Sequence, residues 1–92
     1  MRRIRTGREA QYNSATYTDL KLRIGVAVRA LRANHGWTQE EAAARCEMAP
    51  QLLQRIEAGK TNLTLTTIAR LCEGLGVDAK VLLEAPAQVE PA

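Results

Sequence analysis

Aromatic residues are scarce in this sequence. Its 92 residues include one Trp, two Tyr and no Phe, so a hydrophobic core must be built from Leu, Ile, Val and Ala. No run approaches the roughly 20 consecutive apolar residues that a membrane-crossing helix needs. The N-terminus also lacks the apolar middle of a secretory signal. We therefore expect a cytoplasmic protein with no membrane partner.

Metal ligands and redox groups are scarce as well. The two cysteines, Cys46 and Cys72, have a spacing that fits neither a zinc site nor a redox pair. We interpret both as small apolar packing residues, with a thiol switch as the alternative. The single histidine, His35, makes no metal site. Since the sequence also lacks a nucleophile paired with a base and a phosphate-binding loop, we expect no enzymatic activity and no cofactor.

The sequence does contain apolar residues at helical spacing, and no segment alternates as an exposed strand would. A first helix is predicted from Leu20 to His35, ending at Gly36. Later helices are predicted after the capping residues Thr38, Thr64 and Asp78. The helix that follows Thr64 is predicted to end at the glycines Gly74 and Gly76. The pattern predicts one all-α domain.

Residues 38–60 are the most informative stretch, because they predict two short helices joined by a tight turn. Thr38 and Glu41 have the spacing of a capping box at the start of the first helix. Pro50 suits the first position of the second helix, where its missing N–H has no intrahelical partner. A rotation of about 100° per residue separates an apolar stripe from a polar one. The apolar stripe carries Leu52, Leu53 and Ile56, and the polar stripe carries Gln51, Gln54 and Arg55.

Three motifs make this sequence resemble the Xre family of phage-repressor-like and Cro-like helix-turn-helix domains. They are LRANHGWTQEEAA before the turn, RIEAGK at the end of the second helix, and TLTTIARLCEGLGVDAKVLL after it, within a match from about Leu20 to Glu84. The resemblance implies a compact five-helix bundle that binds double-stranded DNA sequence-specifically, usually as a dimer. Such a protein would be a repressor, a restriction-modification controller or an antitoxin-like regulator.

Within that family frame, each polar residue near the turn has an expected role. Amide and guanidinium groups can meet base edges in a major groove, which assigns Gln51, Gln54 and Arg55 to bases. The expected phosphate contacts are Gln39, Lys60 and Asn62. The last helix is expected to form the interface of a homodimer through Val81, Leu82 and Leu83, and the operator should then be nearly palindromic. For each polar residue, ordinary solvated surface is the alternative.

One ion pair is predicted between the first helix and the second helix of the turn unit. Glu57 lies toward the core side of its helix, where an unpaired carboxylate would be costly. The family pairs this glutamate with an arginine of the first helix, and Arg32 is the matching residue here. We expect the pair to orient the second helix more than to add net stability, since desolvation offsets much of the attraction.

The chain departs from the family pattern at the turn itself. Glu47 stands where the family usually has glycine, so it must adopt a left-handed conformation or the turn must be built differently. Ala49 lacks the oxygen of a usual Ser or Thr cap, and Pro50 replaces a common base-reading glutamine. These departures support an alternative function: a protein-interaction module, with a protein partner, that keeps the fold and has weak or no specific DNA binding.

The two ends of the chain are expected to lie outside the folded domain of residues 20–84. Residues 1–19 are predicted to form a flexible basic arm, whose cations are Arg2, Arg3, Arg5 and Arg8. Such an arm could lie along phosphates or enter a minor groove; the alternative is a disordered leader. Residues 85–92 are small and proline-bearing, and are predicted to be a disordered tail.

Overall fold

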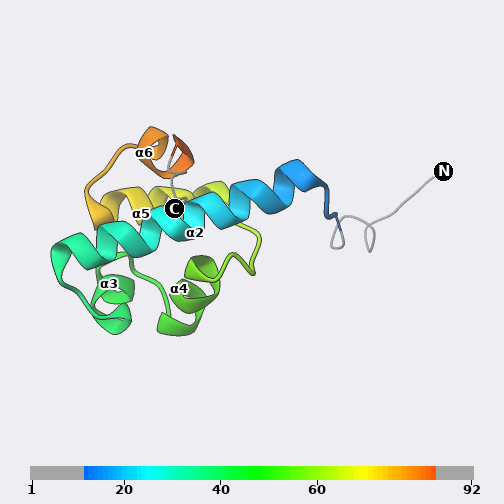
Figure 1. Ribbon diagram of the computed structural model, residues 1–92. Helices are drawn as coiled ribbons and strands as arrows, with labels where there is room; N and C mark the ends of the chain where they lie inside the picture. The colour runs from blue at the N-terminus through cyan, green and yellow to red at the C-terminus, as the bar shows by residue number, and fades with distance from the viewer. Residues whose placement is uncertain (1–11, 85–92) are drawn as a thin grey trace.

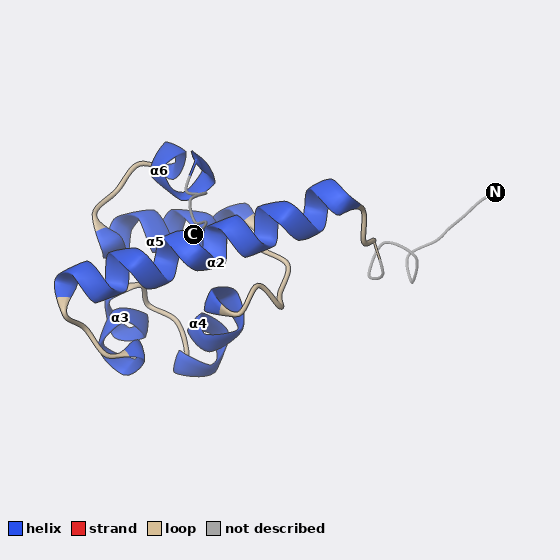
Figure 2. Ribbon diagram, in the orientation of Figure 1, coloured by secondary structure: helices blue, strands red, loops and turns tan. Residues whose placement is uncertain are grey.

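The computed structural model describes residues 12–84, which form five α-helices and no strand (Figures 1 and 2). In chain order the helices are α2 (Ala15–His35), α3 (Gln39–Arg45), α4 (Pro50–Glu57), α5 (Leu65–Leu75) and α6 (Ala79–Glu84). The predicted all-α five-helix bundle is confirmed. The predicted arm residues Arg2, Arg3, Arg5 and Arg8 lie outside the described residues, as does the predicted tail 85–92.

The long helix α2 is the axis of the bundle. α4 and α6 both make their main contacts with α2, while α3 packs against α4 and α5. In Figure 1, α3 and α4 lie together on one side of α2, and α6 lies on the other. The N-terminal turns of α2 continue past the body of the bundle (Figure 1).

α2 begins earlier than the sequence predicts. The Ser14 hydroxyl caps the helix by accepting a hydrogen bond from the Tyr17 backbone N–H at 3.1 Å. Asp19 and Arg23 then form an ion pair of 2.9 Å one turn apart. The prediction that residues 15–19 belong to a flexible arm is therefore wrong, because a cap and polar side-chain pairing support helix where apolar periodicity is absent.

The glycines of α5 have two different roles. Gly76 ends the helix in a left-handed conformation with φ 73°, as predicted. Gly74 does not end it, and that part of the prediction is wrong. A Cβ at residue 74 would lie 2.5 Å from Cys46 Sγ and 2.7 Å from the Arg45 carbonyl oxygen. Gly74 is required because the end of α3 approaches α5 this closely.

The core is aliphatic, and no aromatic residue is among its fully buried members. Its largest fully buried side chains are Leu53, Ile56, Leu71, Leu82, Val28 and Cys46. Cys72 is half-buried beside this core. Burial raises the pKa of both thiols, and for Cys72 the nearby carboxylates Asp78 and Glu73 add to the effect. Both cysteines therefore favour the unreactive thiol form, as packing residues do.

The predicted dimer-interface residues on α6 point in different directions. Leu82 is 1% exposed and belongs to the core of its own bundle. Its assignment to an interface is wrong, because α6 turns this side chain toward α2 and α5. Val81 and Leu83 are 38% and 44% exposed, so these two remain accessible to another molecule.

Candidate nucleic-acid interface

The turn unit starts with a complete capping box. The Thr38 hydroxyl accepts a hydrogen bond from the Glu41 N–H at 3.0 Å, and Glu41 Oε1 accepts one from the Thr38 N–H at 2.8 Å. This fixes the first residue of α3. Ala42 and Ala43 are fully buried in a helix that packs against both α4 and α5. The predicted start of this helix is confirmed.

The turn between α3 and α4 contains a backbone conformation that favours glycine. Glu47 has φ 57°, in the left-handed region. The turn therefore keeps the backbone shape usual for glycine and is not built differently. The Glu47 N–H donates to the Ala44 carbonyl oxygen at 3.1 Å, and its own carbonyl oxygen accepts from Arg70 Nη1 at 3.4 Å. For a non-glycine residue this left-handed conformation costs about 1–2 kcal/mol.

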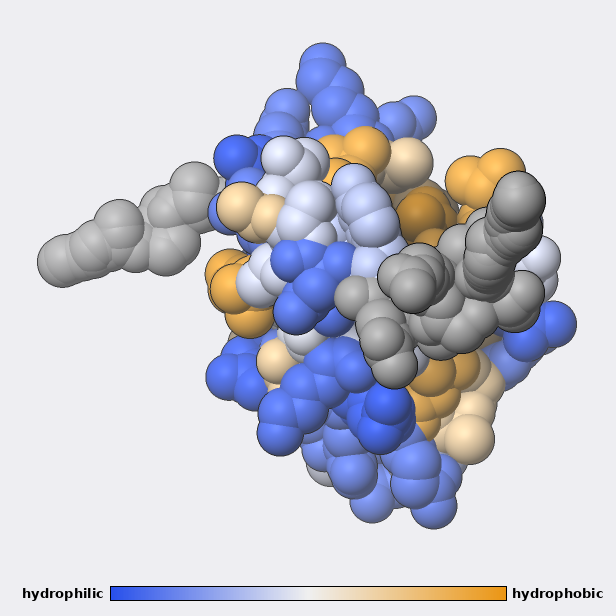
Figure 3. Space-filling view, turned by 90° about the vertical axis from the view of Figure 1, so that its right-hand side faces the viewer, coloured by the Kyte–Doolittle hydropathy of each residue, from blue (hydrophilic) through white to orange (hydrophobic). Residues whose placement is uncertain are grey.

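α4 presents an apolar face to the bundle and a polar face to solvent. Leu53 and Ile56 are fully buried, and Leu52 is half-buried against the core. The predicted base-contacting residues are all exposed: Gln51, Gln54 and Arg55. In Figure 3, hydrophilic residues cover most of the lower part of the molecule, the level at which α4 lies. The polar side chains of α4 are therefore free to meet a ligand outside the protomer.

The loop after α4 holds its cations close to the end of the helix. Gly59, at φ 69°, turns the chain, and the Lys60 N–H donates to the Arg55 carbonyl oxygen at 2.9 Å. The Arg55 guanidinium in turn reaches the Lys60 carbonyl oxygen at 3.4 Å. Lys60 and Asn62, the predicted phosphate contacts of this loop, are both exposed.

The buried Glu57 carboxylate binds the predicted partner and two further residues. Arg32 forms a bidentate pair with it, with Nε 2.6 Å from Oε2 and Nη2 3.1 Å from Oε1. Gln39 Nε2 donates to Oε1 at 3.0 Å, and Arg29 Nε lies 3.7 Å from the same oxygen. Arg32 also donates to the Trp37 carbonyl oxygen at 3.0 Å. One carboxylate thus connects α2, α3 and α4.

The electrostatics of this cluster favour the ionised carboxylate. Burial of Glu57 acts to raise its pKa, but the hydrogen bonds from Arg32 and Gln39, with the charges of Arg32 and Arg29, outweigh burial and lower the pKa below its usual value of 4.5. The hydrogen bond to Glu57 raises the pKa of Arg32. The pair therefore stays charged at neutral pH.

The sequence analysis does not predict that Gln39 and Arg29 contact Glu57. Gln39 was assigned to phosphate alone, yet its half-buried side chain bonds Glu57. Arg29 has no role predicted from the sequence; the only sequence signal is its position three residues before Arg32 on the same helix.

Within residues 12–84, no group of His, Cys, Asp and Glu is arranged to hold a metal ion. No helix in that part of the chain combines the length and apolarity needed to cross a bilayer.

Residues 23–85 match the family described as the helix-turn-helix domain. The chain belongs to that family. The resemblance to its Xre-type members is thereby confirmed. Among curated proteins, the chain is 34% identical over 68 residues to a hypothetical transcription factor of Neisseria meningitidis serogroup B, an alignment that covers 74% of this chain and 64% of that protein. The chain thus spans somewhat less than two thirds of that relative's length.

Solved structures of this helix-turn-helix family have the same architecture. The crystal structure of the hypothetical transcription factor from Neisseria has a TM-score of 0.70 at 33% identity, over 76% of this chain and 80% of that one. The restriction-modification controller protein C.AhdI from Aeromonas hydrophila has a TM-score of 0.65 at 28% identity, over 70% of this chain and 96% of its own. The clp gene regulator from C. glutamicum has a TM-score of 0.64 at 30% identity, over 70% and 83%.

Proposed function

We propose that this protein is a transcriptional regulator that binds double-stranded DNA sequence-specifically, with α4 in the major groove. The observation that supports this most directly is the division of α4 into two faces. Leu53 and Ile56 anchor the helix in the core, while Gln51, Gln54 and Arg55 are exposed. Glutamine and arginine side chains form bidentate pairs with adenine and guanine edges, respectively. The second helix of such a unit is the element that enters the groove.

The remaining polar residues would bind the DNA backbone. Lys60 and Asn62 are exposed beside the end of α4, where they can contact phosphates that flank the bases read by Arg55. Gln39 can also contribute, because its amide carries two N–H donors and Glu57 occupies only one of them. The basic arm that contains Arg2, Arg3, Arg5 and Arg8 would add electrostatic attraction to the duplex, either along the phosphates or in a minor groove.

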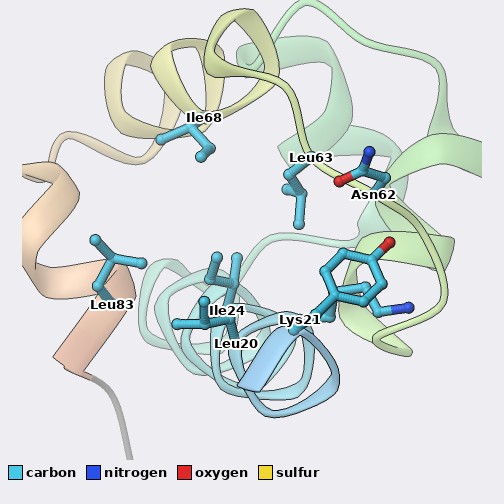
Figure 4. A pocket seen from close by; sticks show the side chains of 8 residues that line it. Leu20, Lys21, Ile24, Asn62, Leu63, Ile68 and Leu83 are labelled. Carbon is cyan, nitrogen blue, oxygen red and sulfur yellow. The ribbon is translucent and has the colours of Figure 1, made fainter. Parts of the chain in front are cut away.

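We further propose that the regulator is a homodimer. Val81 and Leu83 are exposed on α6. Leu83 stands at one end of an open apolar groove of about 240 Å³ that Leu20, Leu63 and Ile68 also line (Figure 4). Burial of this surface against a second copy would add to the small core of one domain. A two-fold dimer would bind two half-sites about 34 Å apart on a nearly palindromic operator.

The relatives' names agree with this class of function. They include a transcription factor, a restriction-modification controller and a clp gene regulator, none of which is named as an enzyme. A repressor, a controller of this kind or an antitoxin-like regulator are all compatible with one helix-turn-helix domain.

The test separates base reading from backbone binding. Fragments of the source genome bound by the protein would supply an operator, and binding to it and to a scrambled duplex would be measured by fluorescence anisotropy. Arg55→Ala should lower discrimination between the two duplexes by about 1–3 kcal/mol. Lys60→Ala should weaken binding to both duplexes alike and flatten the salt dependence. Equal behaviour of the two variants would contradict this division of roles.

The alternative is a protein-interaction module with weak or no specific DNA binding. It is favoured by the left-handed Glu47 and by Ala49, which gives α4 no side-chain cap, because both weaken the N-terminal end of the proposed reading helix. Equal affinity of the wild-type protein for operator and scrambled duplexes, at all salt concentrations, would support this alternative.

A further inference from the structure

A polar hollow lies beside α4, between the N-terminal turns of α2 and the loop that follows α4. It is open to solvent and has a volume of about 450 Å³. Its lining includes Tyr12, Tyr17, Lys21, Arg55, Lys60 and Thr61. In Figure 1, the first turns of α2 and the chain between α4 and α5 border the same side of the molecule. Lys21 and Asn62 stand at one end of the neighbouring apolar groove, away from Leu83 (Figure 4).

The charge of this hollow is of one sign. Lys21, Arg55 and Lys60 bring three cations into it from three different segments, and no carboxylate is among its lining residues. Among residues 12–84, none of these three cations forms a salt bridge. Asp19, two residues before Lys21, is paired with Arg23 instead. The hollow is therefore suited to an anion.

Lys21 is held in position by an aromatic ring. Its Nζ lies 4.3 Å from the centroid of the Tyr17 ring, within the range of a cation–π interaction. Tyr12 packs against Tyr17 with ring centroids 5.5 Å apart. Tyrosine and threonine hydroxyls can donate to phosphate oxygens, so Tyr17 and Thr61 add neutral donors beside the cations.

This side of the hollow lies before the residues that match the family model. The match to the helix-turn-helix family starts at residue 23, after Lys21 and after the turns of α2 that Ser14 caps. The turns of α2 before residue 23 bring Tyr17 and Lys21 to the same hollow as Arg55 and Lys60.

We propose that the hollow binds a phosphate of the DNA backbone that lies outside the bases contacted by α4, and that Lys21 is the residue that contacts it. The inference rests on the proposed function, because Arg55 and Lys60 line the same hollow and orient it toward the duplex. The phosphodiester is recognised by charge and hydroxyl donors and carries no base information. The contact extends the footprint of each protomer along the backbone.

The test compares Lys21→Gln with Lys80→Gln. Lys80 is exposed on α6 and does not line the hollow, so it is a control matched in residue type and charge change. Each phosphate contact contributes about 0.9 to the slope of log affinity against log salt, so between 50 and 200 mM salt the wild type should lose about threefold more affinity than Lys21→Gln. The loss should be the same for operator and scrambled duplexes, and Lys80→Gln should retain the wild-type slope.

A second measurement locates the contact on the DNA. Neutral methylphosphonates are introduced one at a time at the phosphates flanking a half-site. One substitution should weaken wild-type binding several-fold and leave binding by Lys21→Gln unchanged, because the variant no longer uses that charge. A wild-type slope for Lys21→Gln, or equal sensitivity of both proteins at every phosphate, would overturn the inference.

The outcomes separate this inference from the proposed function and from a free anion site. If Arg55→Ala lowers sequence discrimination while Lys21→Gln behaves as wild type, the regulator stands and the hollow has no role in DNA binding. If the wild type binds no duplex, the proposed function itself fails, and the inference fails with it. If inorganic phosphate shifts the NMR signals of the hollow in a Lys21-dependent way while the DNA salt slope is unaffected, the site serves a free anion and the inference is wrong.

Discussion

The two ends of α4 are held in very different ways. At the C-terminal end, Glu57 is buried and bonded to Arg32 and Gln39. Gly25 of α2 lies so close that a Cβ there would be 2.6 Å from the Ile56 carbonyl oxygen. At the N-terminal end, Ala49 provides no side-chain cap and Glu47 adopts a left-handed conformation. The proposed reading helix is therefore fixed at its end and weakly supported at its start.

This difference bears on which side chains can read bases with precision. Arg55 is adjacent in sequence to the buried Ile56, two residues before Glu57, and shares the tightly packed end of α4. Gln51 lies one residue after Pro50, beside the weakly supported turn. We therefore expect Arg55 to dominate discrimination between sequences and Gln51 to contribute less. The following changes either remove the support at the C-terminal end or add support at the N-terminal end.

Glu57→Ala should have the largest effect. It leaves the Arg32 guanidinium half-buried without its carboxylate and leaves Gln39 without its acceptor, and loss of one partner of a buried pair costs about 3 kcal/mol or more. Urea unfolding followed by circular dichroism would measure the loss. Arg29→Ala is the matched control, because Arg29 is 3.7 Å from the carboxylate and its side chain is 62% exposed; it should cost under about 1 kcal/mol. Equal losses would contradict the conclusion that Glu57 fixes the C-terminal end of α4 through Arg32 and Gln39.

Acid should reproduce part of that loss in the wild-type protein. Because the pKa of Glu57 is lowered on folding from its usual value of 4.5, its contribution to stability is complete above about pH 4.5 and disappears as the pH falls through the lower folded-state pKa. Unfolding free energies measured from pH 7 to 3 should fall faster for the wild type than for Glu57→Gln. Parallel profiles would show that Glu57 has no lowered pKa.

The contacts that hold the C-terminal end of α4 could be predicted in part from the sequence. A carboxylate on the core side of a helix needs a cation, and that requirement together with the family frame pointed to Arg32. The participation of Gln39 could not be predicted in the same way, because it depends on how α3 and α4 cross. The left-handed Glu47 and the uncapped Ala49 were visible as departures from a known turn.

The wrong predictions for Leu82, the start of α2 and Gly74 have a common physical origin: the sequence patterns there are short or weak. α6 has six residues, so three consecutive apolar residues do not show which one faces inward, and Leu82 was misassigned. The first turns of α2 depend on Ser14 and on the Asp19–Arg23 pair, neither of which leaves an apolar period. Glycine is common at helix ends, so Gly74 resembles a terminator in the sequence. Its actual role is to let Cys46 pack closely against α5, and this contact is visible only in the structure.

At the weak end of α4, Ala49→Ser should stabilise the protein. Ala49 already has the extended backbone of a helix cap, with φ −69° and ψ 144°, so a serine hydroxyl can accept an N–H of the first turn. The expected gain is about 1 kcal/mol, measured by urea unfolding. Ala49→Val keeps a side chain without an acceptor and should give no such gain. A stable Ala49→Ser protein with unchanged DNA discrimination would show that the start of α4 does not limit reading by Gln51.

Glu47→Gly should have the smallest effect on stability, because two contributions oppose each other. Relief of the left-handed conformation gains about 1–2 kcal/mol, and the greater freedom of glycine in the unfolded chain returns about 0.4–1 kcal/mol of it, which leaves a net gain of about 0.8 kcal/mol at the middle of both ranges. Glu47→Ala removes the same carboxylate but keeps a Cβ, so it should give no gain in urea unfolding. Both variants should bind DNA slightly more tightly at low salt, since each removes a negative charge beside the proposed interface. If Glu47→Ala stabilises the protein as much as Glu47→Gly does, the gain comes from loss of the negative charge, and backbone strain at the turn does not weaken this end of α4.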